Sequence, residues 1–284
     1  MTNTRVAVVV ATRNRRHSLE RTLAHLGGLP EQPHVVVVDN GSSDGSAAAA
    51  RRYGVDVVEL RRNAGPAARN VGVRRVGAPY VAFADDDSWW APDALEPAAR
   101  LFDRYDSLAL VAARVLVGPE EDLDPVSLAM AESPLTAPRP LPGPPVLGFV
   151  ACGALVRRSA FLEVGGFHEV LATGAEETLL AVDLASRGWD LAYVEDVVAH
   201  HHPSSRRDPL ARRRAEARNL LWLAWLRRPL STAVGRTVRV AWTGARDAPS
   251  RRALVDVARA APRLVRERRV APARIEAALD VLDL

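Results

Sequence analysis

The chain has 284 residues, of which 48% are hydrophobic and 25% are charged, with a formal net charge of +4. This length fits one large domain or one domain with an appendage, and the composition excludes a chain that is disordered throughout. The single cysteine, Cys152, excludes a disulfide-stapled fold and a zinc site built on cysteines. All 38 basic residues are arginine, so no lysine is present for catalysis or for a Walker-type phosphate loop.

Charge is distributed unevenly along the chain. Residues 1–200 hold 19 Arg and 26 acidic residues, a net charge of −7, whereas residues 201–284 hold 19 Arg and 8 acidic residues, a net charge of +11. This asymmetry predicts two regions with different roles. The apolar run Leu220–Leu226 is too short to span a bilayer, and Val6–Ala11 is too short for the core of a signal peptide. We therefore expect a cytoplasmic protein, at most peripheral on the inner face of the membrane.

Hydrophobic patterning in the first third of the chain predicts strands that alternate with helices. Strands are expected at Val6–Ala11, Val35–Val38, Val55–Leu60 and Tyr80–Ala84, with a helix around Leu19, Leu23 and Leu26 and another over Pro66–Val76. This alternation predicts an α/β fold, in which a mostly parallel, Rossmann-like sheet is flanked by helices. In such sheets, ligands bind beyond the carboxyl ends of the strands.

The remainder of the chain is less regular. Six prolines between Ser133 and Pro145 exclude a helix or a central strand and predict a long loop, either a lid or a passive surface excursion. Strands are expected at Ala151–Arg157, Leu191–Val194 and Val197–Ala199, and a helix at Glu176–Arg187. Beyond Pro203 the chain is rich in arginine and is expected to be helical, with breaks at Pro229, Pro249, Pro262 and Pro272.

Polar residues follow the predicted strands. They are Thr12, Arg13 and Asn14 after the first strand, Asp39 and Asn40 after the second, and Asp85, Asp86 and Asp87 after the fourth. Three adjacent carboxylates repel one another and favour binding of Mg²⁺ or Mn²⁺, although a helix N-cap would also explain them. In the run from Arg61 to Asn70, Arg69 could meet a phosphate.

Histidines and glutamates provide further candidates. In His200-His201-His202, successive side chains on a strand face opposite sides, so all three cannot bind one metal ion, although one of them could. Glu176 and Glu177 start a predicted helix, where the helix dipole alone explains one acidic residue. The pair also suits a general base that takes a proton from a sugar hydroxyl.

In their order along the chain, these segments resemble the family 2 glycosyltransferases, which have the GT-A fold. The matching segments are Val8–Asn14, Val36–Asp44, Asn63–Gly72, Phe83–Asp87, Arg157–Phe167, Gly174–Glu177, Gly188-Trp189 and Val198–His200. The resemblance covers roughly residues 5–203. It implies an inverting enzyme that moves a sugar from a nucleotide-diphosphate sugar to an acceptor hydroxyl with the help of Mn²⁺ or Mg²⁺.

The resemblance also implies roles for individual residues. Asp39 would contact the base or ribose, and the donor would lie against Thr12, Arg13, Asn14, Asn40, Gly65, Arg69, Asp85 and Asp86. Asp85 and Asp87 would form the metal motif, with Asp87 as the direct ligand, and His200 would close the metal or diphosphate site. Glu177 stands where the family usually has an aspartate as the catalytic base, and Glu176 is the alternative base. Two further departures are Leu179 at a usual acidic position and Asp183 at a usual arginine.

We expect a catalytic domain over residues 1–205, with a nucleotide-sugar half at about 1–117 and an acceptor half at about 118–205. An Arg-rich helical region at 206–284 would follow. Its apolar run Leu220–Leu226 would pack on the catalytic domain or on a partner subunit, such as a second copy; contact with an anionic membrane is the alternative. No motif supports binding of nucleic acid.

The acceptor could be a sugar, a lipid-linked molecule or a natural product. Two other functions are a catalytically inactive nucleotide-sugar-binding protein of the same fold and a nucleotidylyltransferase. The second normally has a glycine-rich loop after the first strand, and the sequence here, from Thr12 to Arg16, contains no glycine.

Overall fold

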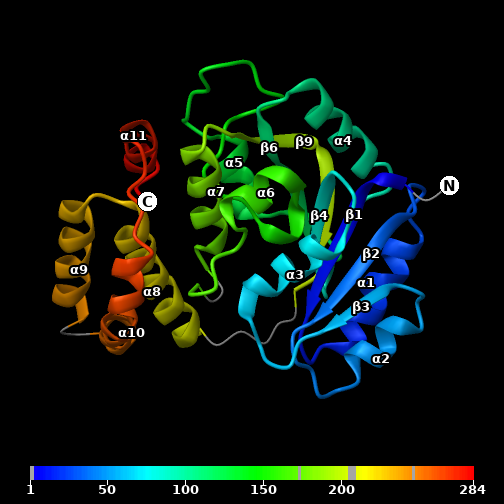
Figure 1. Ribbon diagram of the computed structural model, residues 1–284, viewed down its shortest axis with the longest axis horizontal. Helices are drawn as coiled ribbons and strands as arrows, with labels where there is room; N and C mark the ends of the chain where they lie inside the picture. The colour runs from blue at the N-terminus through cyan, green and yellow to red at the C-terminus, as the bar shows by residue number, and fades with distance from the viewer. Residues whose placement is uncertain (1–2, 172–173, 204–208, 245–246) are drawn as a thin grey trace.

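The computed structural model describes residues 3–171, 174–203, 209–244 and 247–284. Within these ranges, nine strands form one sheet in the order β3-β2-β1-β4-β8-β6-β9-β5, and β7 pairs with β6 outside this path. Helices cover both faces of the sheet, and a separate group of helices lies at one side of it (Figure 1). The predicted α/β fold with a central sheet flanked by helices is confirmed.

The N-terminal half of the sheet is parallel. Its elements are β1 (Asn3–Thr12), α1 (Arg16–Gly27), β2 (Pro33–Asp39), α2 (Ser46–Arg51), β3 (Asp56–Glu59), the 3₁₀ turn η1 (Gly65–Ala67), α3 (Ala68–Arg75) and β4 (Tyr80–Asp85). The valine-rich segments of β1 and β2 are buried on both faces, as expected for a parallel sheet between two helical layers. Helix α3 packs closely on the sheet because Gly72 has no Cβ, which would lie 2.4 Å from Cγ1 of Val9.

The second half of the sheet is mixed. Its elements are β5 (Ser88–Trp90), α4 (Leu95–Arg104), β6 (Leu108–Val117), β7 (Asp122–Leu123), α5 (Pro125–Ala131), η2 (Ala151–Gly153), β8 (Ala154–Arg157), α6 (Arg158–Val164), α7 (Glu176–Ser186) and β9 (Asp190–His201). Strand β8 runs antiparallel to β4 and β6, whereas β6 and β9 are parallel.

Strand β9 is one continuous strand where the sequence predicts two short ones. Its pairing with β6 shifts register between Ala113 and Arg114, and Glu195 and Asp196 lie in this irregularity with exposed side chains. The polar pair therefore interrupts the hydrophobic pattern without ending the strand.

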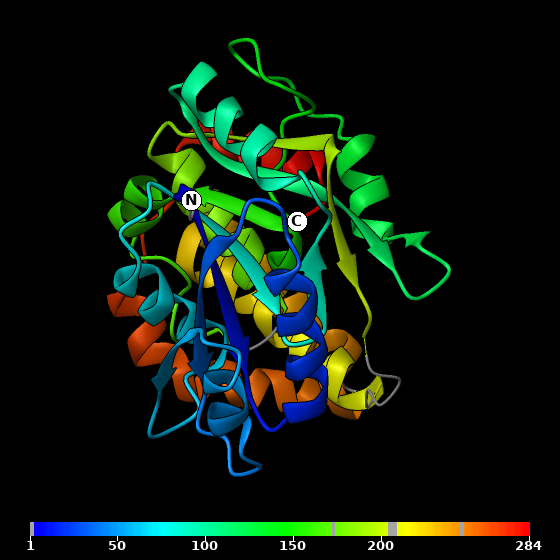
Figure 2. The same ribbon diagram turned by 90° about the vertical axis from the view of Figure 1, so that its right-hand side faces the viewer.

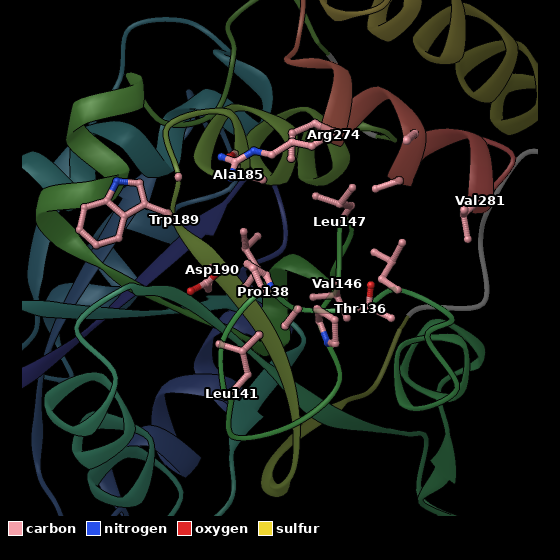
Figure 3. A pocket seen from close by; sticks show the side chains of 18 of the residues that line it. Thr136, Pro138, Leu141, Val146, Leu147, Ala185, Trp189, Asp190, Arg274 and Val281 are labelled. Carbon is pink, nitrogen blue, oxygen red and sulfur yellow. The ribbon is translucent and has the colours of Figure 1, made fainter.

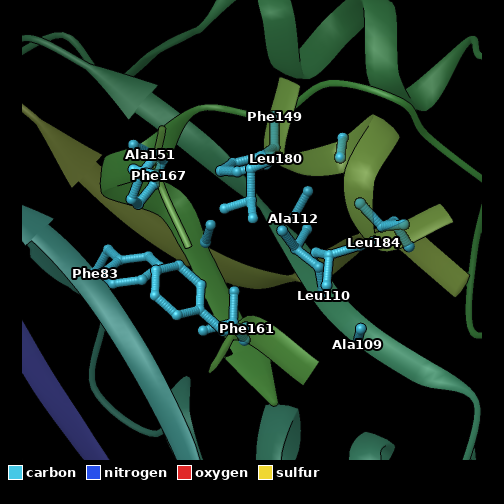
Figure 4. Packing of buried hydrophobic residues seen from close by; sticks show 14 of the residues in the cluster. Phe83, Ala109, Leu110, Ala112, Phe149, Ala151, Phe161, Phe167, Leu180 and Leu184 are labelled. Carbon is cyan, nitrogen blue, oxygen red and sulfur yellow. The ribbon is translucent and has the colours of Figure 1, made fainter. Parts of the chain in front are cut away.

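Two hydrophobic clusters fill the layers on the two faces of the sheet. One of them contains four phenylalanines, and the ring centroids of three of these, Phe83, Phe161 and Phe167, lie 5.5–5.7 Å apart (Figure 4). Tilted and edge-to-face rings at this separation attract one another in addition to excluding water. Phe167 thereby fixes the start of the loop that leads to α7.

Four helices follow the sheet: α8 (Pro209–Arg227), α9 (Leu230–Gly244), α10 (Ala248–Arg266) and α11 (Ala273–Val281). Seen from the side of the N-terminal strands, α8, α9 and α10 lie behind the sheet (Figure 2). In α8, Leu221, Leu223 and Leu226 are buried in a cluster with residues of α7 and α10, so the apolar run Leu220–Leu226 packs mainly inside the molecule. Pro262 lies within α10 and does not end it, contrary to the predicted break.

Ion pairs join these helices to the rest of the molecule. Arg227 pairs with Asp183 of α7, with Nη2 2.8 Å from Oδ2, and Arg228 pairs with Glu276 of α11 at 2.9 Å. Helix α11 packs against the sheet region through Ile275 and Leu279. Among the helices described, none is both long and apolar enough to cross a membrane.

Candidate active site

The carboxyl ends of three parallel strands meet at one edge of the sheet. Thr12 of β1 pairs with Asp39 of β2, and Ala11 pairs with Asp85 of β4. Residues from three of the predicted polar segments are therefore neighbours at this edge. Asp39 is buried, and its Oδ1 accepts a hydrogen bond from the backbone N–H of Ser42 at 2.7 Å.

Two asparagines in this region hold loops together. The side chain of Asn40 accepts a hydrogen bond from the N–H of Ala64 at 2.7 Å and donates one to the carbonyl of Gly65 at 3.1 Å. The side chain of Asn14 accepts a hydrogen bond from the N–H of Ser43 at 2.7 Å. Both predicted donor-binding asparagines therefore have structural partners, while Arg13 is exposed on the first loop.

Arg15 supplies positive charge to the aspartate cluster. Its Nε lies 3.0 Å from Oδ1 of Asp86, and its Nη2 lies 2.8 Å from Oδ2 of Asp87. Thr12 donates a hydrogen bond to Asp86 at 2.9 Å. Burial raises the pKa of Asp86 to about 7; the charge of Arg15 opposes this rise, and that of Asp87 adds to it. Sequence reasoning missed Arg15, although the need of three carboxylates for a cation was a signal for it.

The structure places His201, rather than His200, beside the aspartate cluster. Nε2 of His201 lies 3.5 Å from Oδ1 of Asp87, whereas Nδ1 of His200 lies 3.2 Å from Oε1 of Glu121. The ring of His200 also stacks on Trp89, with centroids 6.0 Å apart. The cause is strand alternation, because neighbouring side chains on β9 point to opposite faces of the sheet.

Arg69 connects the aspartate cluster with the glutamate pair. This buried side chain forms an ion pair with Asp85 and lies over the ring of Phe167, 5.6 Å from its centroid. Burial lowers the pKa of Arg69, but the charges of Asp85 and Glu177 more than offset this effect, so the net pKa is raised. The Nε of Arg69 is buried without a hydrogen-bond partner.

The glutamate pair at the start of α7 is held in an environment that disfavours two negative charges. Glu176 is 3% exposed, and its Oε2 is buried without a hydrogen-bond partner. Burial raises the pKa of Glu177 to about 8, the charge of Glu176 adds to the rise, and the charge of Arg69 opposes it. The pKa of Glu176 is also raised, mainly by burial. The pair can therefore keep one proton near neutral pH.

Helix α8 contacts the turn that precedes the glutamates. This turn has left-handed backbone at Gly174 (φ +99°) and at Ala175 (φ +74°). Asn219, which is fully buried, donates a hydrogen bond to the carbonyl of Gly174 and accepts one from Nε of Arg218 at 2.9 Å. Sequence reasoning missed Asn219, and the signal for it was a polar Arg-Asn pair directly before the apolar run of α8.

The side chains near Asp87 suit a divalent cation that is shared with a substrate. The described residues contain no group of three or more His, Cys, Asp or Glu side chains arranged to enclose a metal ion. Mg²⁺ typically takes only one or two protein carboxylates together with substrate phosphates, so such an enclosure is not required. Asp87 and His201 lie side by side, with Asp85 two residues away, and these oxygen and nitrogen donors suit Mg²⁺ or Mn²⁺.

Two cavities lie outside this cluster. One, of about 670 Å³, adjoins the loop of Asn63–Gly65 and is also lined by Leu171 and Arg263. The other, of about 510 Å³, lies between the proline-rich loop and α11 (Figure 3). It adjoins Asp190 at the start of β9, roughly 35 Å along the strand from His201 at its end. The proline-rich loop is therefore not a lid over the aspartate cluster.

Solved structures identify the architecture. The chain is similar to a mannosyltransferase from Pyrobaculum calidifontis in complex with GDP-Man and Mn²⁺, with a TM-score of 0.62 and 21% identity over 98% of this chain and 86% of that one. It is also similar to residues 1–349 of S. aureus TarS in complex with UDP-GlcNAc, with a TM-score of 0.59 and 18% identity over 77% of this chain and 66% of that one. The fold is the GT-A fold of glycosyltransferases.

Sequence comparison identifies the family. A model described as glycosyl transferase family 2 matches residues 7–165, more than half of the chain. The chain therefore belongs to glycosyl transferase family 2, as its resemblance to that family predicts.

Two relatives come from Mycobacterium tuberculosis. A pre-mycofactocin glycosyltransferase is 33% identical over 218 residues, which cover 73% of this chain and 45% of that protein. An N-acetylglucosaminyl-diphospho-decaprenol L-rhamnosyltransferase is 29% identical over 272 residues, which cover 78% of this chain and 87% of that protein. The chain thus spans less than half the length of the first of these relatives.

Proposed function

We propose that the chain transfers a sugar from a nucleotide-diphosphate sugar to an acceptor hydroxyl, with inversion at the anomeric carbon and with a divalent cation. In this proposal, the donor lies at the carboxyl ends of β1, β2 and β4, and the acceptor approaches from the start of α7. Residues 1–205 would then carry the reaction, with the donor against residues 1–117, and the helices of residues 206–284 would support it.

The observation that carries this proposal is the position of Arg69 between two acidic groups. It pairs with Asp85 on the donor side, and its pKa responds to the charges of Glu177 and Glu176 on the other side. The proposed donor-binding residue Asp85 and the proposed base Glu177 thus both interact with the buried guanidinium of Arg69. A single-displacement transfer needs this arrangement, because the attacking hydroxyl and the leaving diphosphate must lie in line on opposite sides of one carbon atom.

On the donor side, Asp39 would accept hydrogen bonds from the base or ribose, next to the first loop with Thr12, Arg13 and Asn14. The loop that Asn40 holds at Gly65 would form a wall of this site. Support for a nucleotide sugar comes from the two similar structures, whose complexes contain GDP-Man and UDP-GlcNAc. The assay below identifies the base and sugar that this chain binds.

A divalent cation would be held by Asp87 and Asp85, with His201 as the histidine ligand in place of His200. When bound, it would neutralise charge on the diphosphate leaving group. The similar mannosyltransferase structure contains Mn²⁺, which supports this choice of ion. Arg15 and Arg69 would position the aspartates and add positive charge on the leaving-group side.

Glu177 would act as the general base, with Glu176 as the alternative. A carboxylate whose pKa is about 8 is a stronger base than an ordinary glutamate, and its pKa lies closer to neutral pH. It would take the proton of the acceptor hydroxyl as the oxygen attacks. Arg69 would lower the pKa of this carboxyl enough to keep a fraction of it ionised at neutral pH.

For the acceptor, we propose a hydroxyl on a lipid-linked sugar. The support is the similarity, over most of both chains, to a rhamnosyltransferase whose name specifies a decaprenol-linked acceptor. A free sugar or a natural product is the alternative acceptor. Family membership argues against a nucleotidylyltransferase.

The experiment begins with a thermal-shift screen of UDP-, dTDP- and GDP-sugars in the presence of Mn²⁺, because a ligand of the folded state raises its stability. The donor that is found then serves in assays of hydrolysis and transfer with wild type and Asp87→Asn. We expect Asp87→Asn to lose transfer and the stabilisation by Mn²⁺. Full activity of this variant would contradict the metal assignment, and a wild type that binds the donor but never turns it over would favour an inactive binding protein.

A further inference from the structure

Helix α9 presents an apolar ridge to solvent. Leu230, Val234, Val238 and Trp242 follow one another at intervals of four residues and are 58%, 45%, 61% and 84% exposed. Residues at this spacing lie on one side of a helix. The opposite side of α9, at Ala233 and Gly244, is buried against the neighbouring helices. The ridge is therefore a surplus of apolar surface beyond what the packing of α9 requires.

The position of α9 leaves this ridge accessible. The helix lies at the outer edge of the molecule, on the side away from the sheet (Figure 1). Of the six tryptophans in the chain, all within the described ranges, Trp242 is the most exposed. A tryptophan ring exposed to this degree in water is unfavourable, whereas at a membrane surface it can bury its ring and keep its N–H in contact with water.

The charged residues of α9 itself are all positive. Helix α9 contains Arg236 and Arg239 and no acidic residue, and Arg251, Arg252 and Arg259 of α10 are exposed nearby along the chain. Residues 201–284 as a whole carry a net charge of +11. A stripe of apolar residues that includes tryptophan, flanked by arginines, is the pattern of a helix that lies in the surface of an anionic bilayer.

From this geometry we infer that α9 docks on an anionic lipid bilayer through Leu230, Val234, Val238 and Trp242, with its exposed Arg239 at the lipid headgroups. A second copy of the chain fits less well for two reasons. Two regions of charge +11 repel each other, and the ridge exposes on the order of 500 Å², below the roughly 800 Å² per partner of a stable protein interface. The inference does not depend on the donor or on the catalytic residues.

The experiment is flotation of the full chain with vesicles. Two compositions are used: pure phosphatidylcholine, and phosphatidylcholine with 30 mol % phosphatidylglycerol. The test variant is Val238→Ser/Trp242→Ser. The matched control is Val126→Ser/Leu128→Ser, which removes two exposed apolar side chains from α5 at 45% and 47% exposure. Light scattering after size exclusion gives the oligomeric state of each protein.

We expect the wild type and the control to float with the anionic vesicles at low salt, and to lose most of this binding in high salt because salt screens the charges. The test variant should bind at least tenfold more weakly at unchanged thermal stability. Vesicles should also shift the tryptophan emission of the wild type to shorter wavelength, and not that of the variant. The inference is overturned if the wild type does not float, if the test variant floats equally well, or if the wild type is a dimer that the variant converts to a monomer.

Discussion

Replacing Glu177 by glutamine should stabilise the protein at alkaline pH. Burial and the adjacent Glu176 raise the pKa of Glu177 from 4.5 to about 8. Between these values the native state holds a proton that the unfolded state has lost, so the free energy of unfolding falls as pH rises through this window. The stabilising contribution is complete below about pH 4.5 and is lost above about pH 8. Glutamine removes this dependence because it is neutral throughout.

The magnitude follows from the same shift. At 1.36 kcal/mol per pH unit, the full shift corresponds to roughly 5 kcal/mol. The side chain of Glu177 is only half-buried and is coupled to Glu176, so we discount this to about 2 kcal/mol. Glu177→Gln should therefore be more stable than wild type by about 2 kcal/mol at pH 8.5 and nearly equal to it at pH 5.

Urea denaturation at both pH values measures the effect. The control is Glu195→Gln, which alters an exposed carboxylate on β9 and should change the unfolding free energy by less than about 0.5 kcal/mol at either pH. If Glu177→Gln is no more stable than wild type at pH 8.5, or gains the same amount at pH 5, the buried-carboxyl argument is wrong. The same variant should lose transfer and retain donor binding, which would show that the carboxyl is kept for catalysis at a cost in stability.

Three other changes test separate parts of the structure. Asn219→Ala removes the side-chain donor to the carbonyl of Gly174 and should lower kcat about tenfold at unchanged donor KM in steady-state assays. An unchanged kcat would remove its role in positioning the glutamates. His201→Ala should weaken the apparent affinity for Mn²⁺, measured in thermal-shift titrations, about tenfold, whereas His200→Ala should leave this affinity unchanged. The reverse result would restore His200 as the ligand. Gly72→Ala should lower the free energy of unfolding by about 1–3 kcal/mol in thermal unfolding, because its Cβ overlaps the side chain of Val9. Gly77→Ala should cost little, because Gly77 has open space around it. Equal effects would refute the packing argument.

Much of the sheet and its polar edge could be predicted because their signals are local. Continuous β-branched runs such as Val35–Val38 indicate strands buried on both faces, and a parallel order brings their carboxyl ends together. The sequence alone therefore places Asp39 and Asp85 at one edge of the sheet. Their alignment in the structure follows directly from the register of β1 with β2 and β4.

The missed parts of the site depend on contacts between distant residues. Which of His200 and His201 faces Asp87 depends on the phase of β9 in the sheet, and a polar pair inside that strand obscures the phase in the sequence. Asn219 reaches Gly174 across 45 positions of the chain. The Arg-Asn pair marks a polar position on α8, but nothing in the sequence pairs it with Gly174, because any helix that carries an amide side chain could have supplied this hydrogen bond.

The packing of α11 has a consequence for how the protein is made. Ile275 and Leu279 belong to the same buried cluster as Leu180 and Leu184 of α7, so this cluster lacks part of its apolar contact until α11 has been synthesised. At roughly 5–20 residues per second, a ribosome needs on the order of ten seconds to add the residues between α7 and α11. During that interval the sheet region has an uncovered hydrophobic face, to which chaperones can bind until α11 has been made.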